Sequence, residues 1–121
     1  MKHGFDDSDR YAFFVADAEG GYAEWEGAMR AIVSDPRYRQ GMGLLADHRA
    51  QRSILRDGIA RRGFFVEENR GVAPGSRCAV VTSPGFNFGM ARMAKVMMDR
   101  GKVEFGVFDD IDEAREWLTR P

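Results

Sequence analysis

Acidic residues follow three of the apolar segments, where their carboxylates could bind a cation. Asp17 and Glu19 come after the first apolar run, Asp47 after the second, and Asp109 with Asp110 after the last. Carboxylate oxygens are the ligands that Mg²⁺ prefers. The same acids also suit simpler roles, because Asp17 is typical of a turn and Asp110 of a helix N-cap. We therefore expect no metal site and no cofactor.

His48 stands beside Asp47, a combination that suggests acid–base chemistry. Neighbouring residues of a strand point to opposite faces of a sheet, so these two side chains are not expected to form a dyad. Cys78 opens the apolar run 78–81 with no base nearby, which indicates a buried thiol rather than a nucleophile. Because no serine, histidine and acid constellation stands out, we expect a protein that is not an enzyme.

The segment 83–89 precedes an expected helix and is a candidate ligand loop, since a helix N-terminus attracts anions. Its candidate contact residues are Ser83, Gly85, Phe86, Asn87 and Phe88. No Gly-Lys-Ser/Thr follows, so this is not a phosphate-binding P-loop. The alternative is a structural loop in which Asn87 caps the helix and Phe86 or Phe88 packs into the core.

Apolar spacing predicts the elements that position these residues: four strand–helix units. Strands are expected at residues 11–16, 42–46, 77–82 and 103–108. Helices are expected at about residues 22–34, 51–69, 87–100 and 111–118. The alternation predicts four parallel strands in one sheet, with the strand at 103–108 at its edge. We expect these residues to be largely buried: Trp25, Met29, Ile32, Leu45, Val80, Met93, Met97, Phe105, Val107 and Trp117.

Composition predicts one folded domain spanning residues 1–121, because 44% of the 121 residues are hydrophobic and 31% are charged. The net charge of −1 argues against a nucleic-acid binder. No apolar stretch approaches the ~20 residues that a membrane span requires. With a single cysteine and no apolar leader at the start, we expect a cytoplasmic protein.

Charge is distributed unevenly along the chain. Residues 1–35 carry eight acids against three bases, residues 36–62 carry seven arginines against two acids, and residues 103–121 carry six acids against two bases. These arginines could form a docking face, or could lie on solvated surfaces and pair with nearby acids. A twofold arrangement would join the basic middle of one copy to the acidic ends of another, and the edge strand offers a second interface, so we expect a homodimer. Lys102 and Glu104 oppose edge pairing.

Several segments, taken in order, resemble the SpoIIAA-like branch of the STAS superfamily. They are residues 16–20, 35–42, 44–49, 77–81, 88–93, 107–110 and 113–118. The resemblance covers nearly the whole chain. It implies an α/β superhelix of four strand–helix units, with a mainly parallel four-stranded sheet packed by helices.

The resemblance also implies a regulatory role through protein contact, as in anti-sigma-factor antagonists. It places the partner-binding surface at Asp47, Arg49, Arg52 and Ser53. The phospho-regulated antagonists carry Asp-Ser-Ser-Gly after this strand, whereas this chain has Arg52, Ser53, Ile54 and Leu55. We therefore do not expect regulation by that phosphoserine.

The alternative function is a carrier of a small ligand or lipid, of the Sec14-like type. Such a carrier needs a concave apolar pocket of a few hundred cubic ångströms. We expect no large internal pocket in so small a domain. If one exists, it should lie between the helices expected at 51–69 and 87–100, beside Phe64 and Phe65.

Overall fold

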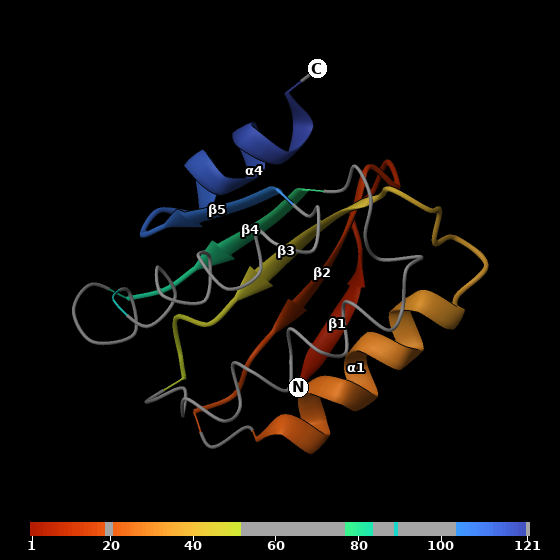
Figure 1. The fold of residues 1–121 in the computed structure, drawn as a ribbon, viewed down its shortest axis with the longest axis horizontal. Helices are drawn as coiled ribbons and strands as arrows, with labels where there is room; N and C mark the ends of the chain where they lie inside the picture. The colour runs from red at the N-terminus through yellow and green to blue at the C-terminus, as the bar shows by residue number, and fades with distance from the viewer. Residues whose placement is uncertain (19–20, 52–76, 84–88, 90–103, 121) are drawn as a thin grey trace.

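The structure is a computed structural model that describes residues 1–18, 21–51, 77–83, 89 and 104–120. Most of the expected helices at 51–69 and 87–100 lies outside these residues, as do Met93 and Met97. Within the described residues the fold is α/β, with a five-stranded mixed sheet and two helices, α1 and α4 (Figure 1). No described helix is long and apolar enough to cross a membrane.

The sheet follows the order of the chain, β1-β2-β3-β4-β5. Its strands are β1 (Lys2–Phe5), β2 (Tyr11–Val15), β3 (Gly43–Asp47), β4 (Arg77–Val81) and β5 (Glu104–Phe108). Strands β2 to β5 are parallel, as the alternation of strands and helices predicted. Strand β5 lies at one end of the order, where the expected edge strand should be.

The described sheet is mixed and has one strand more than the four expected, because β1 pairs antiparallel with β2. Strand β1 was missed because Phe5 is the only hydrophobic residue in Lys2–Phe5, so no apolar run marks it.

The turn before β2 is acidic and ordered by its own hydrogen bonds. The Asp6 carboxylate accepts hydrogen bonds from the backbone and side chain of Arg10, and Asp9 has a positive φ of 52°. Such Asp-rich segments favour tight turns.

Helix α1 (Tyr22–Ser34) packs on one face of the sheet, beside β1 and β2 in Figure 1. Trp25, Ala28, Met29 and Ile32 are its buried residues, so the helix and its apolar stripe are confirmed. The ring of Trp25 meets Phe14 of β2 edge-on, with centroids 6.5 Å apart. The same face buries Ala12, Phe14, Leu44, Ala46, Cys78 and Phe105.

Helix α4 (Ile111–Thr119) packs against β3, β4 and β5 on the other face. Asp110 caps it by accepting hydrogen bonds from the backbone N–H groups of Asp112 and Glu113, which confirms the expected cap. This second layer buries Tyr11, Leu45, Ala79, Val81 and Ala114. The sheet therefore separates two apolar layers, each closed by a helix.

The expected core is largely confirmed among the described residues. Trp25, Met29, Ile32, Leu45 and Phe105 are buried. In contrast, Val80, Val107 and Trp117 are only partly buried. Val107 belongs to the strand at the end of the order, and Trp117 packs at that side with Phe108. Residues at the margin of a sheet have fewer neighbours to cover them.

Candidate functional site

An ion pair between Asp47 and Arg49 stands at the carboxyl end of β3. Arg49 donates from its backbone N–H and from Nε to Asp47 Oδ1, over 3.1 and 2.9 Å, and from Nη2 to Oδ2 over 2.7 Å. Asp47 is only 4% exposed, whereas the Arg49 side chain is 46% exposed. The pair thus joins a buried carboxylate to a guanidinium group that solvent and a partner can reach.

The charge of Asp47 is stabilised by this arrangement. Desolvation by burial acts to raise the pKa of the Asp47 carboxyl, but the hydrogen bonds and positive charge of Arg49 outweigh it, so the pKa is lowered. A carboxylate that stays ionised and bound to arginine is a poor general base at neutral pH. The geometry therefore favours a role in shaping a surface.

A groove of about 640 Å³ opens beside the pair, on the face of the sheet where α4 packs. Phe5 and Phe14 belong to its lining, and Tyr11, Phe13, Val15 and Leu45 add apolar side chains from the sheet. The last four share one face because Phe13 pairs with Leu45 across β2 and β3. Ile111 of α4 adds an apolar side chain to the lining. The groove thus offers an apolar surface with the ion pair in its lining.

Four basic side chains and three acidic ones also line the groove: Lys2, Arg10, Arg49, Arg115, Asp6, Asp7 and Asp47. Asp6 and Asp47 are bound to Arg10 and Arg49. Arg115 contacts Asp112 at 3.6 Å, but both side chains are at least half exposed. Exposed ion pairs of this kind contribute little and exchange easily. Arg115 can therefore turn to an acidic group that enters the groove, whereas Arg49 stays on Asp47 and uses two of its five side-chain N–H donors there.

The His48 ring lies on the opposite face of the sheet from Asp47, as the alternation of side chains along a strand predicted. It packs edge-on against Phe14, in the α1 layer, with centroids 5.3 Å apart. His48 Nδ1 is 2.6 Å from Gln51 Oε1, and since that oxygen can only accept, the bond requires a proton on Nδ1. The hydroxyl oxygen of Thr82 is also buried and has no hydrogen-bond partner among the residues that the structure describes. His48, Gln51 and Thr82 are not part of the lining of the groove.

Three of the acids considered as cation ligands, Asp17, Asp47 and Asp110, have other contacts. Asp17 meets the α-amino group of Met1 at 2.9 Å, Asp47 binds Arg49, and Asp110 caps α4. Among the described residues, no three His, Cys, Asp or Glu side chains gather in a group that could hold a metal ion. Glu19 lies outside the described residues.

The structure places Asp47 and Arg49, two of the four expected partner-binding residues, together at one groove. Arg52 and Ser53 lie outside the described residues, as do Gly85, Phe86, Asn87 and Phe88 of the expected ligand loop. Ser83 is described and partly buried, two residues after β4. Sequence reasoning missed Phe13, Val15, Ile111 and Arg115 as parts of a site. The adjacent aromatics Phe13 and Phe14 were the available signal, because one of them must face away from the α1 layer.

Comparison with known proteins finds no matching family model, no matching curated protein and no matching solved structure. The class that the fold itself defines is an α/β domain with a mixed five-stranded sheet.

Proposed function

We propose that this chain is a non-catalytic regulatory domain that binds a segment of a partner protein in the groove beside Asp47 and Arg49. The observation that carries the proposal is the bidentate Asp47–Arg49 pair, held next to an apolar lining on the side of the sheet where α4 packs. The finer fold that we propose is the STAS arrangement of SpoIIAA-like proteins. The parallel order β2-β3-β4-β5 and the helix between β2 and β3 support it.

The occupant that fits the groove is an acidic segment with at least one apolar side chain. The apolar side chain would lie against Phe13 and Leu45, which share one face of the sheet. A carboxylate of the partner would meet Arg49 or Arg115. Arginine suits this contact because its planar guanidinium group can bind a carboxylate through two parallel hydrogen bonds. Arg52 and Ser53 belong to the proposed surface by their place in the sequence.

Affinity purification from the native host tests this function, using Arg49→Glu and Arg115→Glu as groove variants. Arg30→Glu is the matched control, because Arg30 is exposed on α1, the helix of the other face. We expect a partner that both groove variants release and the control retains. A stable partner that binds all three variants equally would remove the groove from consideration.

A carrier of a small apolar ligand or lipid is the second candidate function. The groove favours it in one respect, since a volume of about 640 Å³ falls within the range of known ligand pockets. Native mass spectrometry of freshly purified protein separates the two functions. An acyl chain or other small molecule retained by the protein would support the carrier, and its loss in Phe13→Asp would locate it in the groove.

We further propose a cytoplasmic homodimer. A single cysteine, buried within β4, suits a reducing compartment. Strand β5 lies at the end of the strand order and is one interface, while the acidic ends and the basic middle of the chain offer another. Light scattering at low and high salt decides between them. A monomer under both conditions rejects the dimer, and a salt-sensitive dimer favours the charged interface.

A further inference from the structure

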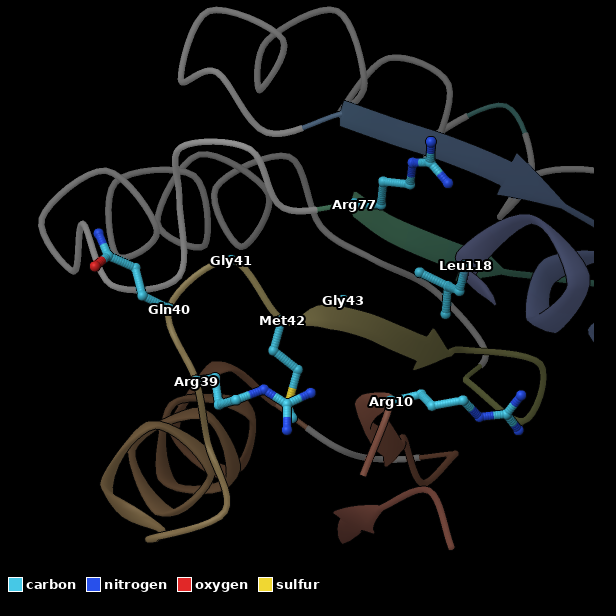
Figure 2. A pocket seen from close by; sticks show the side chains of 8 residues that line it. All are labelled: Arg10, Arg39, Gln40, Gly41, Met42, Gly43, Arg77 and Leu118. Carbon is cyan, nitrogen blue, oxygen red and sulfur yellow. The ribbon is translucent and has the colours of Figure 1, made fainter. Parts of the chain in front are cut away.

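A second pocket lies at the opposite end of the parallel strands from Asp47. Arg10 directly precedes β2, Gly43 begins β3 and Arg77 begins β4, and parallel strands begin at the same edge of a sheet. The pocket among them has a volume of about 370 Å³. Figure 2 shows Arg10, Arg39 and Arg77 on three separate segments around Gly43, with the guanidinium groups of Arg10 and Arg77 turned away from Gly43. Three arginine residues thus contribute to the lining of one small cavity.

Each of these arginines is held by a contact that leaves some of its five N–H donors for a ligand. Arg39 donates from Nη2 to the carbonyl oxygen of Asp9 over 2.9 Å. Arg77 donates from Nη1 to the carbonyl oxygens of Trp117 and Arg120, over 3.1 and 2.7 Å. These oxygens are backbone carbonyls at the C-terminal end of α4. Because they carry no full negative charge, they hold Arg77 in place without neutralising it.

The carboxylates near the pocket balance only part of its positive charge. Asp6 binds Arg10 at 2.7 Å, and the exposed Glu104 approaches Arg77 at 3.4 Å. Among the described residues, no acidic side chain belongs to the lining of the pocket. An anion that enters the pocket therefore meets several positive groups, and the exposed ion pairs around it are weak enough to give way.

A glycine turn fixes the position of Arg39. The backbone N–H of Met42 donates to the carbonyl oxygen of Arg39 over 3.0 Å, and Gly41 between them has a φ of 85°. This conformation strains any residue with a side chain, so glycine suits the turn. The turn leads from Arg39 into β3. It thereby holds Arg39 next to the start of that strand.

We propose that this pocket binds a small ligand that carries more than one phosphate group. Arginine is suited to phosphate because its donors match the spacing of two phosphate oxygens. The three guanidinium groups in Figure 2 point in different directions, so a single phosphate cannot engage all of them at once. A ligand with two linked phosphates offers oxygens to more than one of these arginines. The volume lies near the lower end of the range for ligand pockets, which fits a small molecule.

Calorimetric titration with inorganic pyrophosphate and with inorganic phosphate, at constant ionic strength, tests the proposal. Pyrophosphate should bind about tenfold more tightly than phosphate, because it can use one further charged hydrogen-bonded contact. Arg39→Ala should weaken pyrophosphate binding by about tenfold for the same reason. Arg39→Lys should restore part of the loss, since lysine keeps the charge but not the fork of donors.

Arg37→Ala is the matched control. It removes the same charge two residues away, from an exposed arginine that binds Asp35 and is not in the lining of the pocket. Its effect on pyrophosphate binding should stay within about twofold. Three results would overturn the proposal: no binding of pyrophosphate at millimolar concentration, equal affinity for phosphate and pyrophosphate, or equal losses in Arg37→Ala and Arg39→Ala. Binding to vesicles of phosphatidylcholine with phosphatidic acid, without binding of pyrophosphate, would also contradict a small ligand.

Discussion

The guanidinium group of Arg49 folds back onto the carboxylate of Asp47, with Nε 2.9 Å from Oδ1 and Nη2 2.7 Å from Oδ2. Two donors on two oxygens fix the orientation of both side chains. The backbone N–H of Arg49 also binds Oδ1, so the pair closes the turn that leaves β3. The same contacts therefore stabilise the fold and set the shape of the candidate groove.

Removing the charge of Asp47 should destabilise the protein. Asp47→Asn keeps the size of the side chain but leaves the charged donors of Arg49 beside a neutral amide. We expect the free energy of unfolding to fall by about 1–3 kcal/mol, as for buried hydrogen bonds to a charged group. Urea denaturation measures this difference. Asp112→Asn is the control, because its exposed ion pair should contribute less than about 1 kcal/mol. An equal loss in both variants would show that the pair has no special role.

The stabilisation by Asp47 should depend on pH. Its pKa is lower in the folded protein than in the unfolded chain, so the unfolded chain binds the extra proton first as the pH falls. The contribution should be fully present above about pH 5 and should disappear as the pH falls through the folded pKa. Urea unfolding of the wild type and Asp47→Asn from pH 7 to pH 3 checks the sign. A difference between the two proteins that grows toward acid pH would contradict it.

Cys78 should be inert in the folded protein. It is buried in β4, and desolvation raises the pKa of its thiol to about 12. A thiol reagent at pH 8 therefore meets almost no thiolate and no open path. We expect labelling only after a denaturant is added, and labelling of the native protein as fast as that of free cysteine would show that β4 is not covered.

Local spacing predicted the elements that bury an apolar face. Trp25, Met29 and Ile32 marked α1, and Asp110 marked the start of α4. Strand β1 could not be found this way, because its stability comes from pairing with β2 rather than from its own side chains. An edge strand with one apolar residue has no periodic signal.

The sequence predicted two charged residues of the candidate groove but not its apolar lining. Asp47 and Arg49 were expected on one partner-binding surface because the resemblance to SpoIIAA-like proteins places that surface there. The role of Phe13 depends on which part of the sheet α4 covers, and this arrangement is a property of the tertiary fold. The pocket lined by Arg10, Arg39 and Arg77 could also have been expected from the sequence. Arg10 and Arg77 stand at the starts of strands that run parallel, so they had to lie at the same edge of the sheet, on either side of β3.

Site-specific photo-cross-linking in the native host tests most directly whether the groove is the partner-binding surface. A photoreactive phenylalanine analogue at Phe13 places the probe in the groove, and the same analogue at Ala31 places it on exposed α1, on the other face. We predict one protein adduct from position 13 that is lost when Arg49→Glu is added and is absent from position 31. Adducts of equal yield from both positions, or an adduct from position 13 that is unchanged by Arg49→Glu, would contradict the account.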